Sequence, residues 1–257
     1  MTLHLIGAGL RGISSITLEE NDILEKCRKI YIDAYTSIFP ENFISDLSGR
    51  FRGEIIPLER EELESMDFIM NEEHDFAIIV SGDPFGSTTH MSIARECKHK
   101  NIDLKIYENA SIISIIWGRT GLSAYRSGSV VSIPDFGNEY LPSSPYEKIF
   151  QNISMGLHTI LLVDLKEGMN TDSRRLKEVL ILIRERYSLE DIMGRIAFSI
   201  ERAGWRDEAV HIGLLGNILE KNLSSPYCLV LPGKLDFNEK ENILSLFPDS
   251  HQYLDSK

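Results

Sequence analysis

One short segment combines a carboxylate with glycines that let a ligand approach the main chain. Residues 81–86 read Ser-Gly-Asp-Pro-Phe-Gly and directly follow five apolar residues, 76–80. Five apolar residues are too few for a helix but enough for a strand buried on both faces. Asp83 would then lie at the carboxyl end of a parallel strand, where open α/β sheets bind ligands, and Gly86 would allow close approach. Taken alone, the segment is also typical of a purely structural strand-turn-helix junction.

The residues after this segment predict a helix. Ser87, Thr88 and Thr89 offer side-chain oxygens that can cap a helix running from Met91 to about residue 98. The strand, the loop and the helix together would hold Asp83 in place.

A second strand end offers groups of the opposite electrical character. Ser111 follows an expected strand at 104–107 and precedes an apolar helical stretch at 112–120. The free N–H groups and positive dipole end of that helix could hold a carboxylate. As a plain N-cap, Ser111 would need no function at all.

The first strand, expected at 3–6, leaves through Gly7 and Gly9. Two glycines spaced by one residue allow a sharp turn, but the third glycine of a dinucleotide fingerprint is missing and Gly12 comes one residue early. A nicotinamide cofactor is therefore disfavoured, although Asp33 lies near enough to leave that alternative open.

Strands and helices alternate through the first half of the chain. Strands are expected at 3–6, 29–34, 54–57, 76–80 and 104–107, and Thr17 with Glu20 forms a capping box for the first helix. A further helix is expected over 59–71. This alternation predicts a parallel sheet with helices on both faces.

The pattern changes past Gly121, and we place a domain boundary there, giving domains 1–122 and 123–257. The second half predicts helices at 146–152 and 173–187, the latter capped by Asp172. Residues 134–145 contain three prolines and are interpreted as a connecting or lid segment. Strands are expected at 129–133, 158–166, 196–200, 208–212 and 227–231, with 196–200 and 208–212 forming a hairpin.

Composition bounds the kind of protein. The 257 residues are 42% apolar and 26% charged, which is typical of globular proteins. A net charge of -12 disfavours nucleic acid as a partner, and no apolar run is long enough to span a membrane. Three widely separated cysteines, without a C-x-x-C pair, predict buried thiols and no metal site. With no secretion signal in the first residues, we expect a cytoplasmic protein.

Several motifs, taken together and in order, resemble the diphthine synthases, a family within the tetrapyrrole methylase superfamily. The resemblance covers nearly the whole chain. In corrin-pathway members of the superfamily the first loop ends in Gly-Pro-Gly-Asp, and here Leu10-Arg11-Gly12-Ile13 stands instead. The motifs are Ile6-Gly7-Ala8-Gly9-Leu10, Asp33 to Ser37, Gly82 to His90, Asn109 to Ile112, Gly156 to Thr159, Asp164-Leu165-Lys166, Arg202-Ala203-Gly204 and Pro232 to Leu235.

The resemblance implies a two-domain α/β fold of the tetrapyrrole methylase type, with an N-terminal parallel sheet, a C-terminal mixed sheet and the cofactor in the cleft. It further implies S-adenosylmethionine as methyl donor and S-adenosylhomocysteine as product. The acceptor would be the amino group of the modified histidine of translation elongation factor 2, methylated repeatedly towards diphthine, and the enzyme would be a homodimer. Carried over by motif, the donor contacts are Leu10, Asp83, Gly86, Ser111, Ile112, Val163, Ala203 and Tyr227.

Methyl transfer from a sulfonium needs alignment more than acid or base catalysis, and alignment alone supplies roughly 7 to 11 kcal/mol. We therefore assign no catalytic residue. His90, His158 and Asp164 could take the acceptor proton, although a structural role suits each of them. Two alternatives stay open: a corrin-pathway C-methyltransferase of the same fold, and a nucleotide-binding module without catalysis. Arginines in or beside loops could form a docking patch for the protein substrate, namely Arg50, Arg52, Arg119 and Arg126.

Overall fold

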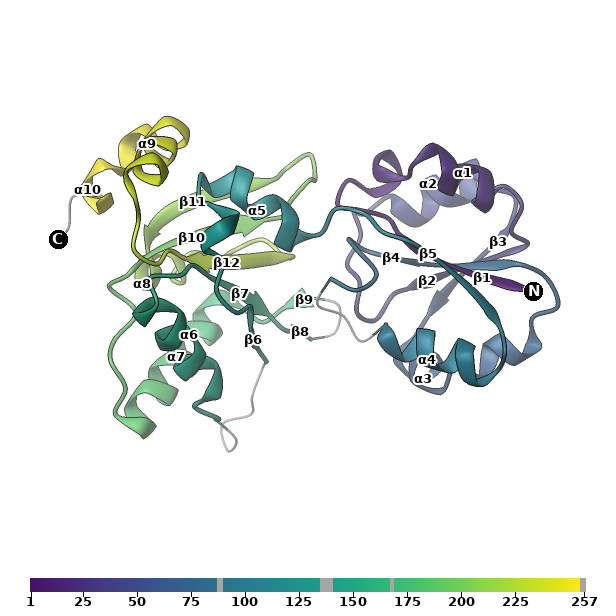
Figure 1. The fold of residues 1–257 in the computed structure, drawn as a ribbon, viewed down its shortest axis with the longest axis horizontal. Coiled ribbons are helices and arrows are strands. Elements are labelled where there is room, and N and C mark those ends of the chain that lie inside the picture. Colours follow the sequence, from purple (N-terminus) through teal and green to yellow (C-terminus); the bar gives the residue numbers. More distant parts are fainter. Residues whose placement is uncertain (87–89, 135–140, 167–168, 255–257) are drawn as a thin grey trace. The chain divides into compact units, whose positions relative to one another are not determined.

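Two units make up the chain in the computed structural model, which describes residues 1–86, 90–134, 141–166 and 169–254. By their internal contacts the units are Met1–Ser114 and Ile115–Lys257 (Figure 1). The boundary expected after residue 122 stays a prediction. The caps expected from Ser87, Thr88 and Thr89, and residues 135–140 of the expected lid segment, lie outside the described residues.

The first unit is built on a five-stranded parallel sheet. Its strands are β1 (Thr2–Gly7), β2 (Lys29–Asp33), β3 (Glu54–Leu58), β4 (Phe76–Val80) and β5 (Asp103–Tyr107). The order is β3-β2-β4-β1-β5, and every neighbouring pair is parallel. The predicted parallel sheet is confirmed, and the carboxyl ends of β2, β4, β1 and β5 lie side by side along one edge.

Helices cover both faces of this sheet (Figure 1). On one face lie α1 (Leu18–Leu24) and α2 (Phe43–Arg50), and on the other lie α3 (Arg60–Ser65) and α4 (Met91–His99). Each face has its own buried core, with Leu24 and Phe43 in one and Ile93 in the other. The capping box at the start of α1 is confirmed, since Thr17 Oγ1 accepts from Glu20 N and Glu20 accepts from Thr17 N.

Two elements of the first unit differ from the sequence-based expectation. The helix expected over 59–71 ends at Ser65, because the next residue, Met66, has a left-handed φ of 55°, and a 3₁₀ turn follows over Asp67–Asn71. This break buries both Met66 and Ile69 under the sheet. Helix α2 was not predicted from the sequence. It buries only Phe43 and Leu47, so its apolar repeat is too short to stand out.

The second unit contains a five-stranded mixed sheet. Its strands are β6 (Val131–Ile133), β7 (Thr159–Val163), β10 (Ile196–Glu201), β11 (Ala209–Leu214) and β12 (Tyr227–Leu231), in the order β11-β10-β12-β7-β6. Only β6 and β7 pair in parallel. The predicted mixed sheet and the β10–β11 hairpin are confirmed. A separate two-stranded ribbon is formed by β8 (Leu165–Lys166) and β9 (Met169–Asn170).

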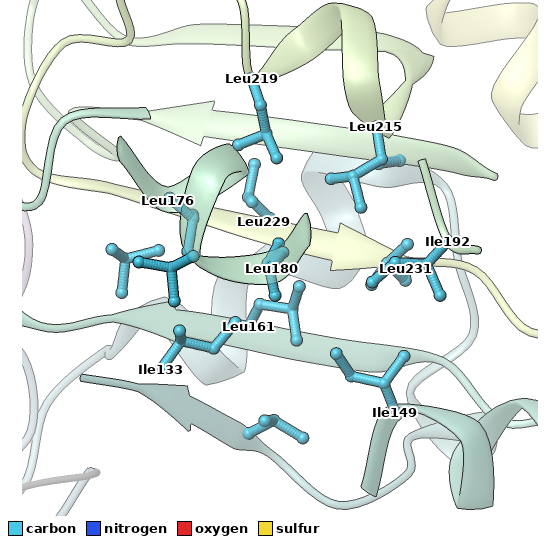
Figure 2. Close-up of a cluster of buried hydrophobic side chains, with 14 of the residues drawn as sticks. Ile133, Ile149, Leu161, Leu176, Leu180, Ile192, Leu215, Leu219, Leu229 and Leu231 are labelled. Carbon is cyan, nitrogen blue, oxygen red and sulfur yellow. The ribbon is translucent and has the colours of Figure 1, made fainter. Parts of the chain in front are cut away.

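One face of the mixed sheet packs against α6 (Ser144–Ser154), α7 (Ser173–Tyr187) and the short α8 (Leu215–Ile218). Leu176 and Leu180 of α7 meet Leu161 and Leu229 of the sheet in this core (Figure 2). Helix α5 (Ile112–Thr120) leads from the first unit into the second, and α9 (Phe237–Leu246) and α10 (His251–Leu254) end the chain. The predicted cap of α7 is confirmed by Asp172 Oδ1, which accepts from Arg174 N and Arg175 N.

All three cysteines are free and buried, as expected. Among the described residues, no helix has both the length and the apolar character needed to span a bilayer.

Candidate functional site

The loops that leave β1 and β4 are bonded to each other at the carboxyl edge of the first sheet. Gly9 N donates to Gly82 O at 3.1 Å, and Gly82 N donates to Gly9 O at 2.8 Å. Both glycines have left-handed backbones, with φ of 58° and 72°. This explains the glycines at these positions, because other residues rarely adopt that conformation. Leu10, directly after Gly9, is half-buried.

Asn109 ties the exit of β5 to the same edge. Its Nδ2 donates to Gly7 O at 2.9 Å and to Ser15 O at 3.0 Å, while its Oδ1 accepts from Ala110 N. A Cβ on Gly7 would lie 2.5 Å from Gly82 O and 2.8 Å from Pro84 Cδ. Three neighbouring strand ends are therefore packed main chain against main chain. Asn109 belongs to one of the motifs of the family resemblance, but the sequence alone predicted no role for it.

Asp83 lies half-buried in this junction, with its carboxylate partly used by the loop itself. Oδ1 accepts from Phe85 N at 2.9 Å, and Oδ2 accepts from Asn109 N at 3.3 Å. The first bond is an Asx turn, in which an aspartate orders the two residues after it. Both oxygens keep further lone pairs, so the charge can also serve a ligand.

Gly86 and Ser111 meet beside Asp83. A Cβ on Gly86 would lie 3.1 Å from Ser111 Cβ and 3.4 Å from Asp83 Cβ. Helix α5 begins at Ile112, as predicted, and Ser111 N donates to Ser114 Oγ at 3.1 Å. The structure thus brings Asp83, Gly86 and Ser111 together from two strand ends, with Ile112 adjoining in the chain.

The other three predicted donor contacts share one edge of the second sheet. Val163 ends β7 and Tyr227 begins β12, where the next pair in register is Leu162 with Cys228. Tyr227 also pairs with Glu201, the last residue of β10, and Ala203 follows two residues later. All three are buried, with exposed fractions of 5 to 8%.

Tyr227 is additionally held by a hydrogen bond from its hydroxyl to Thr171 O at 2.6 Å. Burial, followed by the charges of Asp172 and Glu201, raises the pKa of this hydroxyl. The Tyr227 side chain is therefore neutral and held in a fixed position, and it supplies no charge.

A buried pair of Asp33 and His90 lies beside the Asp83 loop, and sequence reasoning did not predict it. His90 Nε2 lies 2.8 Å from Asp33 Oδ2, and His90 Nδ1 lies 3.0 Å from Pro84 O. Asp33 also accepts from Thr36 N at 2.8 Å. With its side chain wholly buried and so engaged, Asp33 does not offer the exposed carboxylate that a nicotinamide site requires.

The second candidate histidine, His158, forms a structural pair in the second unit. Its Nε2 lies 2.7 Å from Glu239 Oε1, and its Nδ1 accepts from Gly233 N at 3.0 Å. Burial lowers the pKa of His158 despite the neighbouring carboxylate. Burial alone would raise the pKa of Glu239, but hydrogen bonds from Asp236 N, Ser123 N and His158 outweigh it and lower that pKa. Both ring nitrogens of His158 are occupied, so it is a poor proton acceptor.

Two of the four proposed docking arginines are neutralised inside the second unit. Arg119 forms a two-pronged ion pair with Glu208, with distances of 2.5 and 3.2 Å. Arg126 Nη1 lies 2.8 Å from Glu239 and 3.5 Å from Asp236. These contacts leave little net positive charge at either side chain for a docking partner.

Comparison with known proteins identifies the chain as a methyltransferase. The model of the tetrapyrrole (corrin/porphyrin) methylases matches residues 2–219, and the chain belongs to this family. It is similar to diphthine synthase from Thermoplasma acidophilum, with 34% identity over 249 residues and 96% of each chain covered. Diphthine methyl ester synthase from Yarrowia lipolytica is 33% identical over 237 residues, covering 91% of this chain and 78% of that one.

A solved structure gives the same assignment. A crystal structure of diphthine synthase superposes with a TM-score of 0.83 at 27% identity, covering 96% of both chains. The chain is accordingly an S-adenosylmethionine-dependent methyltransferase of diphthamide biosynthesis.

Proposed function

We propose that this enzyme methylates the amino group of the modified histidine of translation elongation factor 2, repeatedly, to form diphthine. The observation that carries the proposal is similarity to diphthine synthases over almost the entire length of both chains. The corrin-pathway alternative is less well supported, because the relatives from Thermoplasma acidophilum and Yarrowia lipolytica are a diphthine synthase and a diphthine methyl ester synthase.

We further propose that the donor is held by the residues that the family resemblance implies, namely Leu10, Asp83, Gly86, Ser111, Ile112, Val163, Ala203 and Tyr227. The chemistry of these residues fits S-adenosylmethionine. Asp83 supplies negative charge for a ligand that bears an ammonium and a sulfonium, and the start of α5 suits its carboxylate. Glycine at 86 keeps a side chain out of the space beside Ser111. Leu10, Ile112 and Val163 offer apolar surface to the adenine.

The bound donor supplies a methyl group that its sulfonium has already activated. The chain's own residues then need only hold the donor, orient it towards the acceptor amine and keep water away. Three side chains could accept the proton of the substrate amine. One of them, His158, has both ring nitrogens engaged in hydrogen bonds. Asp164, exposed directly after Val163, keeps this role as a prediction.

The proposal also includes S-adenosylhomocysteine as product, a homodimer and a cytoplasmic location, where elongation factor 2 works. Exposed aromatic side chains in the second unit support a surface that a second copy could cover. Tyr125 and Phe237 are 100% and 75% exposed.

Label transfer tests this function. Elongation factor 2 from a strain that lacks the enzyme is incubated with the protein and S-adenosylmethionine labelled in its methyl group. We expect label on the modified histidine, located by mass spectrometry of the digested factor. An unlabelled factor, with label on a tetrapyrrole instead, would assign the protein to the corrin pathway.

A further inference from the structure

The ring of His90 faces hydrogen-bond acceptors on both sides. The carbonyl oxygen of Pro84 can only accept, so Nδ1, 3.0 Å away, must carry a proton. Nε2 lies 2.8 Å from Asp33 Oδ2, and one proton is shared across that contact. His90 is therefore either an imidazolium facing a carboxylate or a neutral ring facing a protonated Asp33.

The surroundings of Asp33 place that proton on His90. The carboxylate accepts from Tyr35 N, Thr36 N and the hydroxyls of Thr36 and Ser37 as well as from His90. A protonated carboxyl group could not accept four hydrogen bonds and also donate one. Burial alone raises the pKa of Asp33, but the bonds from His90 and Thr36 outweigh it and lower that pKa. The pair is an imidazolium and a carboxylate, 3% and 0% exposed.

This ion pair is attached to the Asp83 loop at two points. His90 donates to the carbonyl of Pro84, the residue that follows Asp83. At the other end of the loop, Ser81 N donates to Ser37 Oγ at 3.0 Å, and Ser37 Oγ donates to Asp33. A buried ion pair contributes little net stability, because desolvation offsets the attraction of the two charges. What it does provide is a fixed geometry for residues 81–84.

We propose that the His90–Asp33 ion pair is a positioning device, which holds the loop after β4 so that the Asp83 carboxylate faces the methyl donor. This role rests on the donor site proposed above. His90 is then a positioning residue, and it does not accept the proton of the substrate amine, because both of its ring nitrogens are engaged.

The chain contains its own control for the charge state. His158 is equally buried beside a carboxylate, but its Nδ1 accepts from Gly233 N, so it is neutral with a proton on Nε2 only. Nitrogen-15 NMR of the ligand-free wild-type protein separates the two rings. In the folded protein His90 should have two protonated nitrogens, because both face hydrogen-bond acceptors, and His158 should have only one. A single protonated nitrogen on His90 would overturn the ion pair.

Variants test the positioning role. His90→Asn keeps an amide donor near the Nδ1 position, for the Pro84 carbonyl, but loses the contact with Asp33. His90→Gln instead keeps a donor near the Nε2 position, for Asp33. His99→Gln, at the exposed end of α4, the helix that directly follows His90, is the matched control. In calorimetry, His90→Asn and Asp33→Asn should each raise the Kd for S-adenosylmethionine by about tenfold or more, the effect of losing a charged hydrogen bond. His99→Gln should leave it unchanged.

The kinetic pattern distinguishes positioning from proton transfer. With saturating donor, kcat of His90→Asn should fall much less than the affinity does, and the double variant Asp33→Asn/His90→Asn should bind no more weakly than either single one. A fall in kcat at unchanged Kd would overturn the proposal in favour of a proton acceptor. If Kd and kcat were both unchanged in the His90 and Asp33 variants, only the positioning role would be excluded. If the wild-type protein bound no S-adenosylmethionine, the proposed donor site would be excluded as well. Should the variants not fold, the wild-type NMR result still decides the charge state.

Discussion

At the scale of single residues, Asp83 has two roles in this account. Its carboxylate orders the loop in which it lies, and it is proposed to bind the methyl donor. One oxygen orders the loop by accepting from Phe85 N, and the other accepts from Asn109 N at 3.3 Å. The carboxylate is also half-buried, so its charge is incompletely screened. Substitutions that separate the loop bond from the charge can therefore test the donor role.

Asp83→Asn should weaken S-adenosylmethionine binding by roughly 1.5 to 3 kcal/mol, the range for a hydrogen bond to a charged group, with little change in stability. The amide oxygen can still accept from Phe85 N. Asp83→Ala should lose the same affinity and about 1 kcal/mol of stability as well. Titration calorimetry and urea unfolding give the two quantities. Asp103→Asn, at the opposite edge of the same sheet, is the control for the change in net charge. If Asp83→Asn bound S-adenosylmethionine as tightly as the wild type does, Asp83 would be excluded from the site.

His158 gives the second unit a predictable response to acid. Because burial lowers its pKa, the folded state keeps this ring neutral where the unfolded chain, with a value near 6.5, already binds a proton. The stabilisation is fully present above about pH 6.5 and is lost as the pH falls towards the lower folded value. Urea unfolding of the wild type should thus show a loss of stability as the pH falls below about 6.5. His158→Gln, which keeps a donor for Glu239, should show a smaller loss, and an equal one would contradict this account.

At the scale of elements, the order of strands explains the site. Residues far apart in the sequence meet because β4, β1 and β5 are neighbours in a parallel sheet, so their carboxyl ends adjoin. The junction tolerates no side chain at Gly7, where a Cβ would lie 2.5 Å from Gly82 O.

Gly7→Ala should therefore destabilise the first unit by about 1 to 3 kcal/mol, the usual cost of overpacking, and weaken donor binding by displacing the loop that carries Asp83. The matched control is Gly49→Ala in α2, where a Cβ meets no atom within 4 Å. That change should raise stability by about 0.5 to 1 kcal/mol, since alanine favours a helix over glycine. Thermal and urea unfolding measure the stability of both variants. A Gly7→Ala protein as stable as the wild type would show that the junction can accommodate a methyl group.

Sequence patterns predicted the elements whose signal is local. Strand β4 is five apolar residues followed by turn formers, and α7 has a capping aspartate and a regular apolar repeat. Elements whose signal comes from tertiary packing were not predicted. Met66 adopts a left-handed backbone because the break buries it with Ile69, and nothing in residues 59–71 marks that position.

The same distinction applies to the site. Asp83, Gly86 and Ser111 could be found because each belongs to a recognisable strand end. The pairing of Asp33 with His90 joins residues 57 positions apart, and it depends on β2 lying beside β4. Spacing along one sequence does not encode such a contact. An aspartate closing a buried strand, followed by Thr36 and Ser37, was the available signal.

At the scale of the whole molecule, the net charge of -12 and the internal ion pairs of Arg119 and Arg126 argue against docking by a broad basic patch. Arg50 donates to Asn21 Oδ1 at 2.8 Å from an exposed position.

The central claim is that the methyl donor is held where β4 and β5 end in the first unit. A crystal structure of the protein with S-adenosylhomocysteine tests it most directly. The account predicts density for the ligand against Asp83, Gly86 and Ser111, with the Pro84 carbonyl still bonded to His90. A well-ordered ligand bound away from these residues would contradict it.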